Sequence, residues 1–165
     1  VATVFCIAVA LSAALSLASE SLMAGAGMAV ALLILALFIG LGILFDIIGV
    51  AVTAADEKPF HSMAAHKEKG AKEALTLLRN ASRVSSVCND VVGDICGIVS
   101  GTTAAVIVAQ LQRSLDTRTV LLSVGVTALI SGLTIGGKAL GKTFAIRKST
   151  QAVFLAGRFL HLFHR

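Results

Sequence analysis

The sequence contains no tryptophan, no tyrosine and a single proline, and only 14% of its 165 residues are charged. Without tryptophan and tyrosine, no aromatic belt marks the boundary between lipid and water, so the depth of any membrane span must be judged from charges. The basic residues are not interleaved with aromatic ones, which excludes a typical nucleic-acid partner despite the net charge of +5. Nucleophile motifs, phosphate-binding loops and dinucleotide-binding motifs are also missing, so we do not expect an enzyme.

Hydrophobic residues, by contrast, are abundant. They make up 56% of the chain, and the mean hydropathy of +0.91 is too high for a soluble domain of this length. The cysteines Cys6, Cys88 and Cys96 lie in apolar segments without a metal-ligand spacing, so we expect small buried hydrophobes there. This composition predicts an all-α integral membrane protein.

Four apolar runs are long enough for a bilayer core, which takes about 20 helical residues to cross. They cover residues 1–18, 28–55, 84–111 and 120–137. The first run has no preceding basic region, so we favour a retained helix over a signal peptide. The second exceeds one span, which predicts either a tilted helix or one kinked or unwound near Gly49.

Two further segments are basic and amphipathic, and both are predicted to be juxtamembrane helices that lie on the lipid surface. They cover residues 57–82 and 138–165. Residues 58–83 and the tail each hold six Lys/Arg, whereas Arg113 and Arg118 are the only two elsewhere. By the positive-inside rule, both segments are expected on the cytoplasmic side of the cell membrane, with about four transmembrane helices between the two faces.

Three aspartates lie within the spans: Asp46, Asp90 and Asp94. An ionised aspartate at the centre of a helix costs about 2.5 to 3.5 kcal/mol on insertion scales, so each needs a cation, a wet cavity, a basic partner or neutralisation. Asp90 and Asp94 are four residues apart and share a helix face beside Asn89. Oxygen ligands of this kind suit Mg²⁺. The alternative is that these two acids sit at the interface and pair with Arg79 or Arg83.

Glycines recur at four-residue intervals in the last two spans, which predicts close packing of helices within the bundle or across a homodimer. The rows are Gly93, Gly97 and Gly101, then Gly132 with Gly136, and Gly137 with Gly141.

The residues 71–80 (AKEALTLLRN), 88–93 (CNDVVG) and 134–141 (TIGGKALG) resemble elements of the CorB/CorC/cyclin-M (CNNM) family. In that family, a cytoplasmic amphipathic helix leads into a helix opening with Gly-Asn-x-Leu-Val-Asn. A later Glu-x-x-Pro-Lys-x-x-Ala element precedes a juxtamembrane helix. The resemblance covers residues 45–165 as the family's transmembrane domain. Residues 1–44 hold an extra N-terminal transmembrane helix and most of the second.

The resemblance implies transport of a divalent metal cation, Mg²⁺ first and with Na⁺ as a candidate second ion, through a site between helices. It matches Asp46, Asn89 and Thr134 to positions of the family's cation ligands. The predicted metal ligands are therefore Asp46, Asn89, Asp90 and Thr134, with Asp94 nearby. Asn89 keeps the family's residue, whereas an aspartate replaces the family's serine at 46 and a threonine replaces its glutamate at 134. The family also implies a homodimer and a separate cytoplasmic regulatory chain. The competing interpretation is a non-transporting membrane scaffold or interaction protein that keeps the fold.

Overall fold

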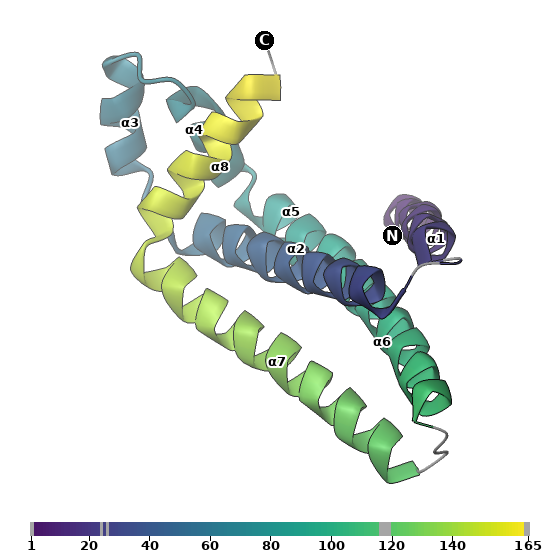
Figure 1. Cartoon of the computed structure of the whole chain (residues 1–165). Helices are drawn as coiled ribbons and strands as arrows, with labels where there is room; N and C mark the ends of the chain where they lie inside the picture. Colours follow the sequence, from purple (N-terminus) through teal and green to yellow (C-terminus); the bar gives the residue numbers. More distant parts are fainter. Residues whose placement is uncertain (1, 24, 26, 116–119, 164–165) are drawn as a thin grey trace. The chain divides into compact units, whose positions relative to one another are not determined.

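The computed structural model describes residues 2–23, 25, 27–115 and 120–163. Every regular element within these residues is a helix (Figure 1), which confirms the predicted all-α class for this part of the chain. The elements are α1 (Ala2–Met23), α2 (Met28–Ala54), α3 (Lys58–Ala65), α4 (Ala71–Arg79), α5 (Ala81–Ser86), the π-helix η1 (Val87–Gly93), α6 (Asp94–Ser114), α7 (Val120–Arg147) and α8 (Ser149–Phe163). Arg118, which entered the charge count, lies outside the described residues.

Four helical stretches are long and apolar enough to cross a membrane, the number expected from the sequence. They are Phe5–Met23, Met28–Ala54, Ala81–Ser114 and Val120–Arg147. The first, third and fourth extend beyond the apolar runs, because a helix does not stop at its first charged residue when a long side chain can reach water. Helix α2 is continuous through Gly49, so the unwinding considered for this position is not found.

The chain divides into two compact units, each built from separate stretches of sequence. Unit 1 contains residues 1–42 and 93–136, and unit 2 contains residues 43–92 and 137–165. The chain therefore passes between the units three times. The sequence boundary expected after residue 44 lies next to the first of these passages.

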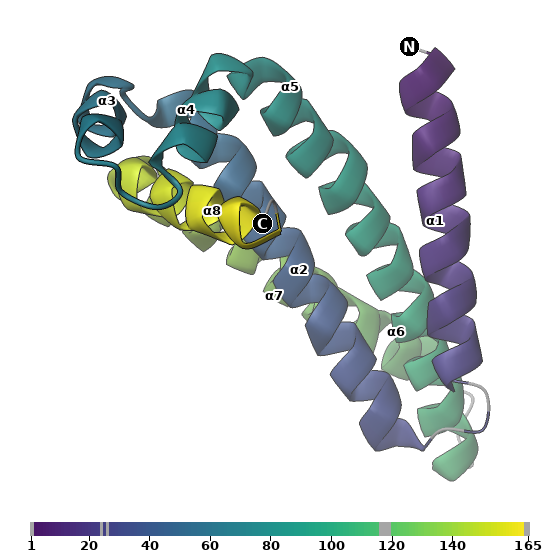
Figure 2. The same cartoon turned by 90° about the horizontal axis from the view of Figure 1, so that it is seen from above.

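In unit 1, α1 crosses α6 and contacts it near one end (Figure 2). The two helices meet at a pair of buried hydroxyls, Ser19 and Thr103, whose oxygens share a hydrogen bond of 3.5 Å. A hydroxyl that is bonded across helices satisfies its polar group without water, which suits a segment that lies in lipid.

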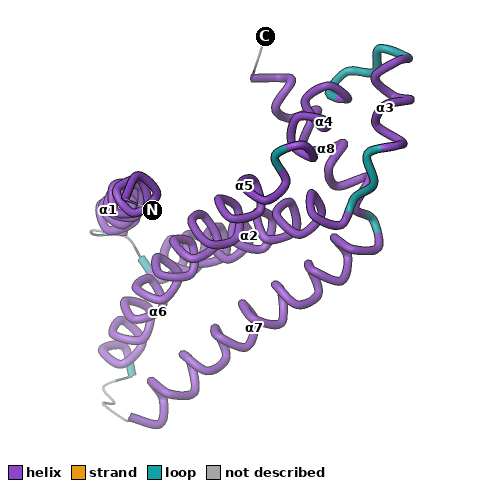
Figure 3. Tube along the Cα trace, turned by 180° about the vertical axis from the view of Figure 1, so that it is seen from behind, coloured by secondary structure: helices purple, strands orange, loops and turns teal. Residues whose placement is uncertain are grey.

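Unit 2 carries a compact helical layer in which α4 and α8 pack against each other (Figure 3). Gly70 and Gly157 bring the two backbones into direct contact, since a Cβ on Gly157 would come within 2.9 Å of the Ala74 nitrogen. His161 and Glu73 join the same two helices through a 2.7 Å contact between Nδ1 and Oε1.

The predicted single amphipathic helix over 57–82 is instead α3, α4 and the beginning of α5. The chain breaks between α3 and α4, where Lys67 has φ = 57° and Gly70 has φ = 91°. Left-handed residues cannot continue an α-helix, and glycine adopts this conformation readily. The apolar side of the segment is also buried rather than lipid-facing. Its residues Phe60, Ala74, Leu75 and Leu78 are at most 9% exposed and share a core with α2, α7 and α8.

The predicted tail helix over 138–165 is divided as well. Helix α7 runs through Lys138 to Arg147, and the separate helix α8 begins at Ser149. The outer face of α8 exposes apolar side chains, with Leu155 at 68%, Phe159 at 64% and Leu162 at 73% exposure. Of the two amphipathic segments, the tail is therefore the one with an apolar face turned outward.

The glycine rows behave in two ways. Gly137 and Gly141 lie against Ile43 and Ile47 of α2, where a Cβ on Gly141 would come within 3.0 Å of Ile47, so the predicted close packing is confirmed there. Four other members of the rows have open space where a Cβ would be: Gly97, Gly101, Gly132 and Gly136.

Candidate cation site

Asp46 is the charged residue that the fold buries. It lies in the last third of α2 and is 4% exposed, while the other buried polar residues in the described part of the chain are hydroxyl-bearing serines and a threonine. Its Oδ2 atom lies 3.8 Å from Nζ of Lys142 on α7. That separation is an ion pair but too long for a hydrogen bond, and Oδ2 has no hydrogen-bond partner. The carboxylate is therefore compensated in charge, but its Oδ2 acceptor is not used by any hydrogen bond.

Asn89 approaches α2 three residues beyond Asp46. A Cβ on Gly49 would overlap the Asn89 carboxamide, so only glycine leaves room for this side chain. Asn89 lies in the middle of η1, and its Nδ2 donates a 3.3 Å hydrogen bond to the Ser85 hydroxyl one turn earlier. Its Oδ1 is buried without a hydrogen-bond partner. Short π-helical stretches within longer helices occur frequently at functional sites.

Three buried side-chain oxygens lack a hydrogen-bond partner among the described residues: Asp46 Oδ2, Asn89 Oδ1 and Gln110 Oε1. Gln110 belongs to unit 1, whereas Asp46 and Asn89 belong to unit 2, in which Asn89 contacts α2 at Gly49, three residues beyond Asp46. A buried acceptor without a partner costs about 1–3 kcal/mol. A carboxylate and an amide oxygen left in this state are the ligand types that a hard divalent cation prefers.

The other predicted ligands are placed differently. Asp90 and Asp94 are exposed, and the described part of the chain contains no ion pair between them and Arg79 or Arg83. Thr134 is half-buried, and its hydroxyl donates a 2.8 Å hydrogen bond to the Ile130 carbonyl. Nor do three or more His, Cys, Asp or Glu side chains gather anywhere in the described residues in a way that could hold a metal. Asp46 and Asn89 are thus the two predicted ligands whose buried oxygens remain unpartnered.

Sequence reasoning missed Lys142. The sequence places it in the predicted surface tail, because the apolar run of the fourth span ends before the first lysine, Lys138. Helix α7 continues past both lysines, which carries Lys142 along α2 to Asp46. The available signal was the uninterrupted helical sequence from 120 to 147, which contains no proline.

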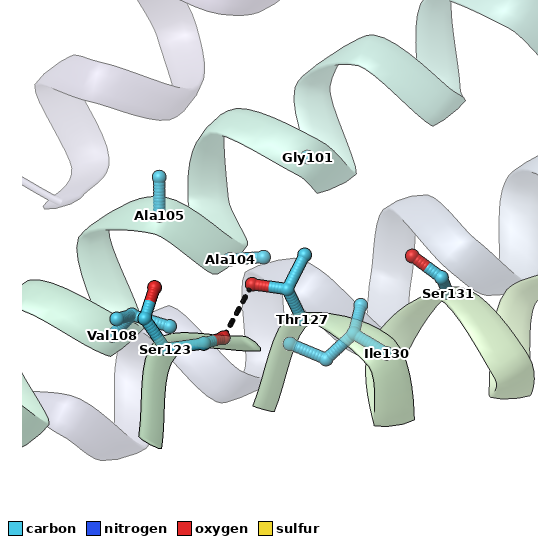
Figure 4. A pocket seen from close by; sticks show the side chains of 8 residues that line it. All are labelled: Gly101, Ala104, Ala105, Val108, Ser123, Thr127, Ile130 and Ser131. Atoms are coloured by element: carbon cyan, nitrogen blue, oxygen red, sulfur yellow. Dashed lines mark hydrogen bonds between the residues drawn. The ribbon is translucent and has the colours of Figure 1, made fainter. Parts of the chain in front are cut away.

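Unit 1 contains a separate groove between α6 and α7, with a volume of about 220 Å³ (Figure 4). Its lining consists of Gly101, Ala104, Ala105, Val108, Ser123, Thr127, Ile130 and Ser131. The Thr127 hydroxyl donates a 2.8 Å hydrogen bond to the Ser123 carbonyl at the edge of the groove. Because no charged side chain lines it, this groove lacks the carboxylates that a divalent cation requires.

Comparisons with protein-family models, with curated proteins and with solved structures give no match for this chain. A functional proposal therefore rests on the chemistry of Asp46, Asn89 and Lys142, together with the resemblance described for residues 45–165.

Proposed function

We propose that this chain is a multi-pass protein of the cell membrane that transports a divalent cation, Mg²⁺ in the first instance, through a site formed in part by Asp46 and Asn89. The observation that carries the proposal is the pair of buried oxygens without hydrogen-bond partners, Asp46 Oδ2 and Asn89 Oδ1. Mg²⁺ binds oxygen, keeps several of its waters and commonly uses only one or two carboxylates, so a sparse ligand set suits it. The resemblance to CorB/CorC/cyclin-M proteins at residues 88–93 supports the same function.

Energetics favour a functional role for Asp46 over a purely structural one. An ionised carboxylate at membrane depth is unfavourable and marks an ion pathway more often than a packing position. Transport would require the site to open alternately to the two sides of the membrane, as sites near the centre of other transporters do.

The direct test is Mg²⁺ flux into proteoliposomes that contain the purified chain. Asp46→Asn and Asn89→Ala are expected to lower the flux at least about tenfold, which corresponds to about 1.4 kcal/mol. Glu68→Gln removes one negative charge from an exposed position of the same unit and is expected to retain wild-type flux. The Mg²⁺ flux of Asp90→Asn and Asp94→Asn shows whether these two acids belong to the site. Wild-type flux would limit the proposed ligands to Asp46 and Asn89, whereas a loss of flux would favour the wider predicted ligand set.

Equal flux in the wild type, Asp46→Asn and Asn89→Ala would rule out the proposed site. In that case the second function, a membrane interaction protein that keeps the fold without transporting, would be favoured. The open glycine faces at Gly97, Gly101, Gly132 and Gly136 are the observation that supports this alternative, since small residues allow another helix to approach closely.

We also propose that α8 is the segment of the chain that lies on lipid at the cytoplasmic face. Its outward side chains Leu155, Phe159 and Leu162 are all more than 60% exposed. Residues 138–165 contain six Lys/Arg and no acid, which favours an anionic lipid surface. Helices α3 and α4 would then lie on the far side of α8 from the lipid, because their apolar residues are buried.

The absence of tryptophan makes this placement measurable. Leu155→Trp and Thr76→Trp each introduce a single fluorophore, on exposed positions of α8 and α4 respectively. In vesicles that contain brominated lipid chains, we expect strong quenching for Leu155→Trp and weak quenching for Thr76→Trp. The reverse order would mean that α4 faces the membrane.

A further inference from the structure

We propose that Lys142 is a built-in competitor of the transported cation, whose ammonium group occupies Asp46 until a diffusible cation displaces it. This inference rests on the proposed function and adds a residue that sets the affinity and the charge selectivity of the site. The contact that carries it is the 3.8 Å separation of Lys142 Nζ from Asp46 Oδ2. Oδ2 is also buried without a hydrogen-bond partner, so it keeps an unused acceptor beside the ammonium group.

The ammonium group and a metal ion bound at this carboxylate oxygen would repel each other. Mg²⁺ binds oxygen at about 2.0–2.1 Å, whereas Nζ already lies 3.8 Å from the same atom. An ion placed there would be within a few ångströms of a like charge, and repulsion is poorly screened around a side chain that is 5% exposed. Binding of the cation therefore requires the ammonium to withdraw.

The two partners differ in their freedom to move. The side chain of Lys142 is 55% exposed, while that of Asp46 is 5% exposed. A lysine stem is long and flexible, and it can carry its ammonium from a buried partner to a wetter position without moving the helix. The lysine is thus the partner that moves, and Asp46 keeps a positive charge beside it before and after the exchange.

This exchange also favours divalent over monovalent ions. A monovalent ion that displaces the ammonium replaces one positive charge with one positive charge, so the carboxylate gains little Coulomb energy. A divalent ion adds a second charge at a shorter distance, and its attraction to the carboxylate is larger. Lys142 would therefore keep Na⁺ and K⁺ from occupying the site at ordinary concentrations.

The test measures Mg²⁺ binding by titration calorimetry on the full chain in detergent. Lys142→Met keeps most of the side-chain volume and removes the charge, and it is expected to bind Mg²⁺ about tenfold more tightly, or about 1.4 kcal/mol. In the same variant, added Na⁺ should weaken Mg²⁺ binding, whereas in the wild type we expect added Na⁺ to have little effect. Lys72→Met is the matched control, because it removes one lysine charge from an exposed position of the same unit and is expected to leave the affinity unchanged.

A second readout needs no metal. In a chelating buffer, Lys142→Met leaves the buried carboxylate of Asp46 without its counter-charge and should lower Tm, because an uncompensated buried charge is destabilising. In the double variant with Asp46→Asn, this loss should largely disappear, so that the two substitutions are non-additive. Additive effects on Tm would overturn the inference.

The outcomes of the titration separate this inference from the proposed function. If the wild type and Lys142→Met bind Mg²⁺ equally, through Asp46, the competitor role is overturned and the transport site stands. If binding tightens in Lys142→Met while flux does not depend on Asp46, the competitor role stands and the transport function falls. If neither protein binds Mg²⁺ through Asp46, both are overturned.

Discussion

Gly49→Ala is expected to remove most of the Mg²⁺ flux and to lower Tm, although the substitution adds only one methyl group. That methyl would overlap the Asn89 carboxamide, so either Asn89 or helix α2 has to shift. Overpacking of this kind costs about 1–3 kcal/mol, which corresponds to a fall in Tm of roughly 2–12 °C for a chain of this length. The displaced side chain is one of the two proposed ligands, so stability and transport should fall together.

Gly40→Ala is the matched control, because it lies in the same helix and has open space where a Cβ would be. Alanine is the better helix former by about 1 kcal/mol, so this variant should keep its flux and melt at the same temperature or higher. If Gly49→Ala behaves like Gly40→Ala in both assays, Asn89 does not approach α2 at this point, and the proposed site loses one of its two sides.

Gly157→Leu is expected to separate α8 from α4. Gly157 faces the Gly70 carbonyl and the Ala74 nitrogen, so a leucine would press on backbone atoms that have no rotamer by which to yield. We expect a loss of stability of at least about 3 kcal/mol, the upper part of the range for overpacked cores. The measurement is hydrogen exchange, in which the amides of 71–79 and 149–163 should lose protection while those of α6 keep theirs.

Gln151→Leu places the same side chain on an exposed position of α8 and serves as the control for this second prediction. It should leave exchange in both helices unchanged. A Gly157→Leu variant with native protection in 71–79 would show that the two helices are held by the core around Phe60 and Val153 rather than by the glycine contact.

The fold was predictable where one property dominates, and less so where packing decides. Long apolar runs are sufficient to place four membrane-length helices, since few other structures tolerate such segments. The break at Lys67–Gly70 was visible in principle as a glycine between two amphipathic stretches. The side on which the apolar residues of α4 are buried was not visible, because this burial depends on α8, which begins 70 residues after the end of α4.

The candidate site divides in the same way. Asp46 stood out because a carboxylate within an apolar run needs compensation wherever the helix lies. Asn89 was selected by a family resemblance. Its contact with Gly49 and the π-helical turn that presents it both depend on how two helices meet, which spacing in one sequence does not specify. Lys142 could not be predicted, because a lysine normally marks the end of an apolar span. In the structure, Asp46 on the neighbouring helix compensates the charge of Lys142, so the helical span continues past this lysine.

The π-helical stretch Val87–Gly93 has a geometric consequence for Asn89. Such a turn contains one residue more than an α-helical turn, because its backbone hydrogen bonds join residues five apart instead of four. An extra residue turns the side chains that follow it by about 100° around the helix axis, the angle between successive residues at 3.6 per turn. The wide turn thus helps to determine which side chain of this stretch faces α2, and in this structure that side chain is Asn89.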